Sequence, residues 1–392
     1  MDVLAERRAE GGSMIVTVVC DVLGEENNGT TVAAMNLIRA LKAKGHTVRV
    51  LCGDEERRGE EGFYIAPKLN LWPFNGYVAK VGVSLAKGDP KIIAEAFDGT
   101  DLVHIMTPFS LGMKAMKVAE QMGIPVTAGF HCQAENMTAY VGLNKVGFLS
   151  HFVYAFLYRR FFRYADAIHY PSAFIREVFE SSIRKKTRGY VISNGVNGSV
   201  RRAHVERPAE WRDRIVIVST GRYSREKAQD VLIKAVQRAK HRDTIQLVLA
   251  GQGPQEPYYR ALAKRLPIPP VFRFYERTEI GNVLNCCDLY VHPAEMELEG
   301  IACLEAIKCG KLTIVSDSKL SATRTFAVDD RCVFRRGSAK DLARVIDWWI
   351  DHPEERALCE ERYAASDCAV GQEVCMAKME QMFLEVSHEV RA

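Results

Sequence analysis

The sequence predicts an α/β protein of two domains, each built on a parallel sheet. The chain has 392 residues, which is longer than one ordinary hydrophobic core accommodates. Short β-branched runs alternate with segments whose apolar residues recur at helical spacing, first from Ile15 and again from Ile215. This alternation is typical of doubly wound, Rossmann-like sheets, and its restart near Ile215 indicates a second domain.

The composition indicates a soluble globular protein. Apolar residues make up 47% and charged residues 26% of the chain, and a net charge of +4 gives no reason to expect a nucleic-acid partner. The eleven cysteines form no C-x-x-C pair and lie partly in apolar segments, as expected of reduced cysteines in a cytoplasmic protein. The adjacent Cys286 and Cys287 have no second pair at ligand spacing, so no metal site is predicted.

The first domain is expected at residues 14–198, after a polar, disordered leader at 1–13. Its first loop ends in Gly29 and Thr30, where a glycine lets the backbone approach a ligand. A later strand delivers His131 at its carboxyl end, the edge at which open α/β sheets bind ligands. The expected strands of this domain are Ile15–Val19, Thr47–Leu51, Asp101–Met106, Pro125–Phe130, Ala167–Tyr170 and Tyr190–Ser193.

The segment Gly147–Tyr164 has the length of a helix, many aromatic residues and three arginines near its end. Such a helix can dock on an anionic membrane surface, with its rings in the interface and its arginines at the headgroups. It can equally be a helix half-buried in the first domain, with its arginines in solvent. The sequence leaves both interpretations open.

The second domain is expected at residues 199–370. Its first strand, Ile215–Ser219, leads into Gly221 and Arg222, and Lys227 follows at the start of the next helix. Two cations beyond the carboxyl end of a strand can neutralise a diphosphate.

The next strand of this domain, Gln246–Ala250, leads into a second glycine turn at Gly251 and Gly253. The third glycine of a dinucleotide fingerprint is replaced by Glu256, so the turn does not indicate an NAD site.

The stretch from Asp288 to Asp317 carries most of the predicted chemistry. A short strand leads into an acidic loop, and Gly300 then begins a segment with helical spacing of its apolar residues. The N–H groups at this helix start offer a site for an anion such as a diphosphate. The carboxylates of Glu297 and Glu305 flank it, and ionised carboxylates accept hydrogen bonds from the hydroxyls of a sugar or ribose.

Glu297, seven residues and then Glu305, in the setting HPAEMELEGIACLEAIKCG, resemble the E-x7-E signature of retaining glycosyltransferases of the GT4 type. Arg222 and Lys227 match the G-R-x4-K segment of the same family. The resemblance implies the GT-B fold: two Rossmann-like domains facing a central cleft, with a C-terminal helix at 371–392 returning to the first domain. It also implies transfer of a hexose from a nucleoside-diphosphate sugar, of UDP-glucose type, with an α linkage.

The resemblance also implies roles for single residues. Arg222 and Lys227 would stabilise the leaving diphosphate, Glu297 would bind hydroxyls of the donor sugar, and Glu305 would bind the ribose. With no D-x-D pair in the chain, these cations would replace a metal ion, and no cofactor is expected. The catalytic residues are expected to be His131, Arg222, Lys227 and Glu297. The donor-binding residues are expected to be Gly29, Thr30, Gly221, Gly251, Gly253, Glu299, Gly300, Ile301, Ala302, Cys303, Leu304 and Glu305.

The acceptor is the least determined part of the prediction. The segments HCQAENMTAYVGL and SATRTFA are similar to diacylglycerol glucosyltransferase-like members of the family, which implies diacylglycerol or another membrane lipid and peripheral contact with the inner face of a membrane. A polysaccharide-building transferase stays open. So does a nucleotide-sugar epimerase of the same architecture, for which His131 and Glu135 are the candidate acid and base, and a binding protein without catalysis.

Overall fold

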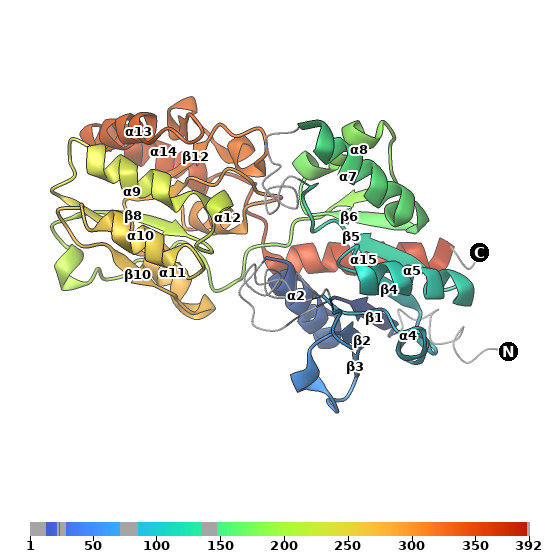
Figure 1. Ribbon diagram of the computed structural model, residues 1–392. Coiled ribbons are helices and arrows are strands. Elements are labelled where there is room, and N and C mark those ends of the chain that lie inside the picture. Colours follow the sequence, from blue (N-terminus) through green and yellow to red (C-terminus); the bar gives the residue numbers. More distant parts are fainter. Residues whose placement is uncertain (1–12, 22, 24–28, 71–84, 135–146, 390–392) are drawn as a thin grey trace. The chain divides into compact units, whose positions relative to one another are not determined.

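The computed structural model describes residues 13–21, 23, 29–70, 85–134 and 147–389. The chain divides into two compact units, and each is described by itself (Figure 1). Unit 1 comprises Met1–Asn194 together with Glu373–Ala392, and unit 2 comprises Gly195–Gln372. Of the predicted leader, all but Ser13 lies outside the described residues, as does Glu135.

Unit 1 contains a seven-stranded parallel sheet in the order β3-β2-β1-β4-β5-β6-β7. The order reverses between β1 and β4, which makes their carboxyl ends the topological switch point. The strands are β1 Ile15–Val19, β2 Thr47–Cys52, β3 Phe63–Ile65, β4 Leu102–Ile105, β5 Val126–Gly129, β6 Ala167–Tyr170 and β7 Gly189–Val191. The helices are α2 Gly29–Ala43, α4 Pro90–Phe97, α5 Ser110–Met122, α7 Gly147–Arg160, α8 Ala173–Ile183 and α15 Gln372–Glu389, with 3-10 turns η1 Glu55–Arg57 and η2 Phe162–Tyr164.

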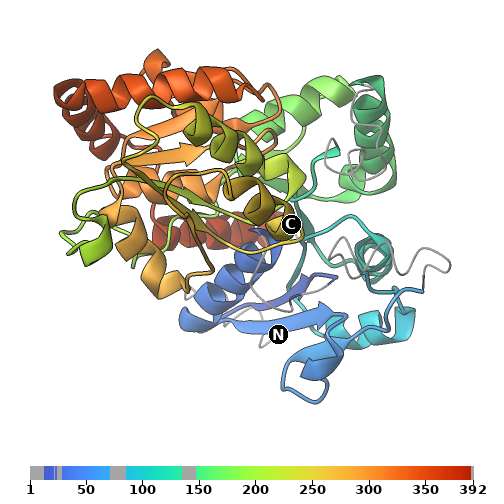
Figure 2. The ribbon, with the colours of Figure 1, turned by 60° about the vertical axis from the view of Figure 1, so that its left-hand side comes forward.

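Unit 2 contains a six-stranded parallel sheet in the order β10-β9-β8-β11-β12-β13, with the reversal between β8 and β11. Figure 1 and Figure 2 show helices packed around this sheet. The strands are β8 Ile215–Thr220, β9 Ile245–Ala250, β10 Val271–Arg273, β11 Leu289–His292, β12 Thr313–Ser316 and β13 Val333–Phe334. The helices are α9 Gln229–Arg238, α10 Glu256–Ala263, α11 Arg277–Cys286, α12 Ile301–Lys308, α13 Ala339–Asp351 and α14 Pro353–Ala364, and the 3-10 turns are η3 Ala209–Trp211, η4 Arg225–Lys227, η5 Ala322–Phe326 and η6 Asp330–Cys332.

The central strands are buried because helices cover both faces of the sheet. All six residues of β9 and all four of β11 are buried, which is the pattern of parallel strands in doubly wound sheets. The predicted fold class is therefore confirmed: both units have the doubly wound parallel sheet, and the last helix belongs to unit 1.

Helix α15 is part of the core of unit 1 although it comes at the far end of the chain. The Phe383 side chain is fully buried, and its ring centroid lies 5.2 Å from that of His104 in β4. Glu380 accepts hydrogen bonds from Lys44 and from His46, the latter at 2.8 Å, and Tyr190 donates to Glu385 at 2.8 Å. The helix is thus fixed to the sheet by one aromatic contact and by polar contacts beside it.

Two predicted helices differ in their bounds. The helix expected at 147–164 ends at Arg160, because Phe161 leaves the helical conformation (φ −141°) and buries its ring, as does Phe162. In unit 2, Lys227 does not lie in the first turn of a helix. It ends the 3-10 turn η4, Ala228 takes a left-handed conformation (φ 51°), and α9 begins only at Gln229.

None of the helices in the described part of the chain combines the length and apolar composition that a membrane span requires.

Candidate active site

The loop after β11 is fixed by backbone hydrogen bonds on both sides. Glu295 N donates to Glu226 O at 2.8 Å, in the 3-10 turn that also carries Lys227. Glu297 N donates to Leu320 O at 3.2 Å, and Glu297 O accepts from Ala322 N at 3.0 Å. These contacts hold Glu297 at the switch point between β8 and β11, where open sheets bind ligands.

The Glu297 carboxylate forms an ion pair with Lys227. Lys227 Nζ and His292 Nε2 both contact Oε1, the histidine at 2.8 Å, and the Glu297 side chain is 11% exposed. Burial by itself raises the pKa of Glu297, but the charge of Lys227 and the hydrogen bonds from His292 and Lys227 outweigh it and lower the pKa to about 2. Glu297 is therefore ionised at neutral pH and accepts hydrogen bonds only.

Helix α12 begins directly behind this loop. Gly300 precedes it with a left-handed conformation (φ 90°), and a Cβ atom here would lie 2.4 Å from Thr323 Cγ2. In the described part of the chain, no side chain caps this helix start, so the N–H groups of Ile301 and Ala302 are available to an outside acceptor, whereas those of Cys303 and Leu304 donate to Gly300 O. The sequence needs glycine at this position for both backbone conformation and space.

Glu305 lies in the second turn of α12 and is partly buried. Burial raises the pKa of Glu305 to about 7, although the charge of Arg277, at the start of α11, acts in the opposite direction. Its charge state therefore changes near neutral pH, in contrast to that of Glu297. The two acids of the motif lie in different environments within one loop and helix.

The two glycine turns of unit 2 pack against each other. A Cβ atom on Gly251 would lie 2.0 Å from Gly221 O, and one on Gly253, whose φ is 157°, would lie 2.6 Å from Tyr223 O. The turns are joined by hydrogen bonds from Gly221 N to Ala250 O (3.0 Å) and from Tyr223 N to Gln252 O (2.9 Å). Half-buried Arg222 is held by this contact, and its carbonyl accepts from Gln229 Nε2 at 3.0 Å.

Two family models match nearly the whole chain. "Glycosyltransferase Family 4" matches residues 27–200, and "Glycosyl transferases group 1" matches residues 201–365. The chain belongs to the glycosyltransferases.

The chain is also similar to individual proteins and solved structures. The alpha-monoglucosyldiacylglycerol synthase of Streptococcus pneumoniae is 27% identical over 54% of this chain, and the match spans half the length of that protein. The solved catalytic domain of cholesterol-alpha-glucosyltransferase from Helicobacter pylori is 45% identical, covering 38% of this chain and 94% of that domain, with a TM-score of 0.38. HepE from Anabaena, solved with UDP and glucose, is 14% identical and covers 95% of this chain and all of that one, with a TM-score of 0.71, and so shares the GT-B fold.

Within this glycosyltransferase, the predicted site residues fall into two groups. His131, Gly29 and Thr30 belong to unit 1, where Gly29 and Thr30 open α2 and are more exposed than His131. The remaining predicted residues belong to unit 2, in which the structure brings together the loops that follow β8, β9 and β11. They are Gly221, Arg222, Lys227, Gly251, Gly253, Glu297, Glu299, Gly300, Ile301, Ala302, Cys303, Leu304 and Glu305.

His131 follows β5 and is 9% exposed. Its ring centroid lies 5.6 Å from that of His169, and within the described residues its Nε2 has no hydrogen-bond partner. Burial, and to a lesser degree His169, lowers the pKa of His131 to about 3, so the imidazole is neutral. A neutral, buried ring can position a hydroxyl, but it is a poor source of protons at neutral pH.

Sequence reasoning missed the residue that supports Glu297. His292 is the last residue of β11 and is 2% exposed, and no role is assigned to it from the sequence although it begins the motif segment. The sequence position of His292 could have indicated this role, because a polar side chain on a buried strand, five residues before a motif acid, needs a hydrogen-bond partner.

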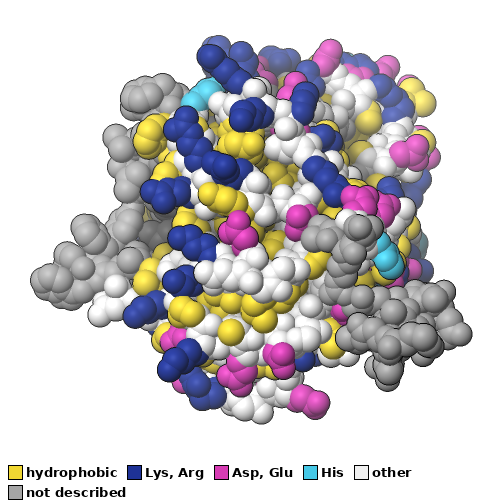
Figure 3. Space-filling model, turned by 90° about the vertical axis from the view of Figure 1, so that its right-hand side faces the viewer, with side chains coloured by type: hydrophobic (Ala, Val, Ile, Leu, Met, Phe, Trp, Pro, Cys, Tyr) yellow, Lys and Arg dark blue, Asp and Glu magenta, His cyan; other side chains and the backbone are white. Residues whose placement is uncertain are grey.

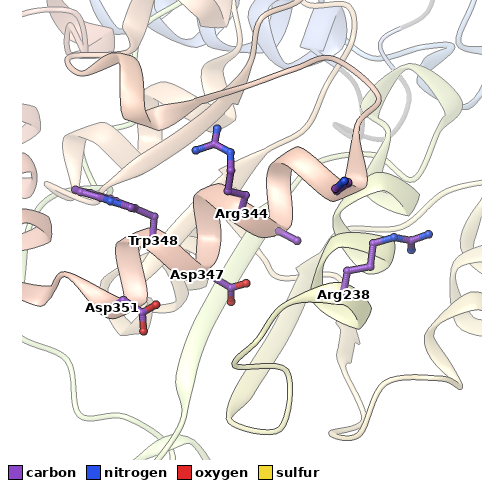
Figure 4. Close-up of a pocket in the computed structure, with 7 residues that line it drawn as sticks. Arg238, Arg344, Asp347, Trp348 and Asp351 are labelled. Atoms are coloured by element: carbon purple, nitrogen blue, oxygen red, sulfur yellow. The ribbon is translucent and has the colours of Figure 1, made fainter.

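A surface cavity of about 520 Å³ between α9 and α13 lies outside this site (Figure 4). None of the predicted residues lines it, and two of its acids are already bonded, Asp347 to the Lys240 N–H at 2.9 Å and Asp351 to the Lys240 ammonium at 3.0 Å. In Figure 4, Arg238 extends from the neighbouring helix away from these acids.

Proposed function

We propose that this chain transfers a hexose from a nucleoside-diphosphate sugar, of UDP-glucose type, to a hydroxyl acceptor with retention of the α configuration. The observation that carries the proposal is the Lys227–Glu297 ion pair beside the uncapped start of α12. It joins a cation for phosphate, an ionised acceptor for sugar hydroxyls and backbone N–H groups for an anion in one place.

The proposed reaction exchanges one bond at the anomeric carbon for another. The bond from this carbon to the diphosphate oxygen breaks, the acceptor oxygen bonds to the same face, and the acceptor proton passes to the leaving phosphate. Arg222, Lys227 and the N–H groups near Ile301 would stabilise the negative charge that develops on the diphosphate. The ammonium of Lys227 has three protons, so it can keep its bond to Glu297 while it donates to phosphate.

Glu297 and Glu305 would hold the two sugars of the donor. Glu297, ionised and supported by Lys227 and His292, would accept from hydroxyls of the transferred hexose. Glu305 would accept from the ribose diol. Neither acid is assigned as a nucleophile, which agrees with attack on the face that the diphosphate leaves.

The test is a product assay with UDP- and GDP-sugars against diacylglycerol, a sterol, a lipid extract and free sugars. A glycolipid product is expected, and free sugars as the preferred acceptor would favour a polysaccharide-building enzyme. Incubation with the donor alone distinguishes a transferase from an epimerase, because only an epimerase makes a new sugar nucleotide under this condition. No product from any pair, together with no binding of any nucleotide sugar by calorimetry, would overturn the proposal.

We also propose that the acceptor is a membrane lipid reached through α7, with the protein bound peripherally at the cytoplasmic face. The helix buries Tyr154 and Leu157, whereas Phe152 is 66% and Phe156 is 45% exposed on neighbouring turns. Arg159 and Arg160 follow at its exposed end. Figure 3 shows one face of the molecule, on which lysine and arginine side chains lie among apolar and acidic ones.

Exposed aromatic rings next to cations are the composition of a helix that binds anionic lipid. The double variant F152A/F156A should therefore lose binding to vesicles of phosphatidylglycerol while keeping its affinity for the nucleotide. Leu358→Ala, which removes an equally exposed apolar side chain (64%) from unit 2, is the matched control. Unchanged vesicle binding by the double variant would contradict membrane contact through α7.

A further inference from the structure

A chain of buried hydrogen bonds leads from the end of β8 to Glu297. Thr220 Oγ1 lies 2.9 Å from Tyr290 OH, which lies 3.2 Å from His292 Nδ1, and His292 Nε2 lies 2.8 Å from Glu297 Oε1. Thr220, Tyr290 and His292 are at most 6% exposed. This series of hydrogen bonds therefore connects the strand that precedes Arg222 with the loop that carries Glu297, inside one unit.

Glu297 fixes the direction of the bond at its end of this series. An ionised Glu297 can only accept, so His292 donates from Nε2, and when the ring carries a single proton that proton is on Nε2. Nδ1 is then an acceptor, and Tyr290, whose pKa is raised well above 10 by burial, donates to it. The Tyr290 oxygen in turn accepts from the Thr220 hydroxyl.

Oε1 of Glu297 is the meeting point of this chain and of Lys227. Both hydrogen bonds described for the carboxylate end on this one oxygen, which leaves Oε2 to a ligand. Without His292, Lys227 would be the remaining described partner, and the carboxylate could turn with the flexible lysine side chain. The bond from a rigid ring at the end of a strand removes that freedom.

We propose that His292 is a positioning residue, held in its Nε2–H tautomer by Tyr290 and Thr220, which orients Glu297 toward the hexose of the donor. The orientation of Glu297 toward a hexose rests on the proposed function. The tautomer of His292 does not depend on it. It predicts that His292 matters for the sugar of the donor and not for the nucleoside diphosphate.

The kinetic test compares His292→Asn, which is too short to reach Glu297, with His292→Gln, whose amide can donate near the position of Nε2. His292→Asn should lower kcat by roughly ten- to hundred-fold through misplacement of Glu297, with the affinity for UDP alone unchanged within about two-fold, as expected if the diphosphate contacts stay intact. His292→Gln should restore most of the loss. Tyr290→Phe keeps the His292–Glu297 bond and should have a smaller effect than His292→Asn. His352→Gln, an exposed histidine bonded to Trp348 O at 2.7 Å, is the control and should leave kinetics unchanged.

Wild-type kcat in His292→Asn would overturn the proposal, and so would an equal loss of affinity for UDP and for UDP-sugar. A function-independent readout is the ¹⁵N spectrum of histidine-labelled protein, with the His292 signal assigned by its loss in His292→Gln. The Nε2–H tautomer is expected, and an Nδ1–H tautomer would overturn the proposal even in an enzyme without detected transfer. If the tautomer is as expected and no nucleotide sugar binds, the proposed function fails instead.

Discussion

Replacing Glu305 with glutamine should stabilise the protein and weaken donor binding at the same time. The pKa of Glu305 is raised from 4.5 to about 7 by burial, so ionising this side chain in the folded protein is unfavourable. At about 1.4 kcal/mol for each pH unit, the difference between the pKa of 4.5 and that of about 7 corresponds to about 3 kcal/mol of folding stability. Because the pKa is higher in the folded protein, the wild type has this contribution in full below pH 4.5 and loses it as the pH rises through 7.

Glutamine has nearly the same shape and no charge to bury. The free energy of unfolding of Glu305→Gln relative to wild type should therefore increase by roughly 2–3 kcal/mol between pH 5 and pH 8. Urea unfolding followed by tryptophan fluorescence measures it, since Trp211, Trp348 and Trp349, three of the four tryptophans, belong to unit 2. Glu354→Gln, at an exposed position, should show no such increase.

The same variant should bind UDP roughly ten- to hundred-fold more weakly at pH 8, because a charged acceptor for the ribose diol is lost. In the wild type, affinity should fall as the pH drops below about 7, and this dependence should disappear in Glu305→Gln. A gain in stability of equal size at pH 5 and pH 8, or unchanged affinity for UDP, would refute the reasoning.

Three further changes test other parts of the structure. Gly251→Ala places a Cβ 2.0 Å from Gly221 O and should weaken UDP binding at least ten-fold by calorimetry, as expected when the loop backbone must shift, whereas Gly198→Ala, with nothing within 4 Å, should not. Phe383→Ala removes a fully buried ring and should lower the stability of unit 1 by about 3–5 kcal/mol in hydrogen exchange, while Val374→Ala, 52% exposed in the same helix, should change little. Burial lowers the pKa of His169 to about 4, so unit 1 should lose stability as the pH falls below 6.5, by about 2 kcal/mol at pH 5 for this residue; a His169→Gln variant with the same pH dependence in urea unfolding would contradict this.

The fold was predictable where apolar residues alone determine an element. The buried strands from Ile15 and Ile215 follow directly from their β-branched runs. Helix α14 was not predicted, because only Cys359 and Tyr363 of its twelve residues are buried and its sequence has no apolar period. The start of α9 was misplaced because Ala228 takes a positive φ, which a sequence signals only when the residue is glycine or asparagine.

The site was predictable in its members but not in their pairing. The motif spacing identifies Glu297 and Lys227, yet 70 residues separate them and nothing in either segment indicates that they bond to each other. The raised pKa of Glu305 depends on burial by other elements. The lowered pKa of Glu297 depends on the balance between burial and the charge of Lys227. Such balances are properties of the packed unit, so the sequence indicates which groups are present but not their protonation.

The placement of α15 has a consequence for how the chain acquires its structure during synthesis. Unit 1 is assembled from residues up to Asn194 and from residues after Gln372, and the 178 residues of unit 2 (195–372) are translated in between. At about 5–20 residues per second, the ribosome needs roughly 10–40 s for them. Throughout that interval the nascent first half lacks Phe383, whose ring lies against His104 of β4 in the finished unit. Unit 2 can therefore fold while the chain is still attached to the ribosome, whereas unit 1 is complete only after α15 has been translated.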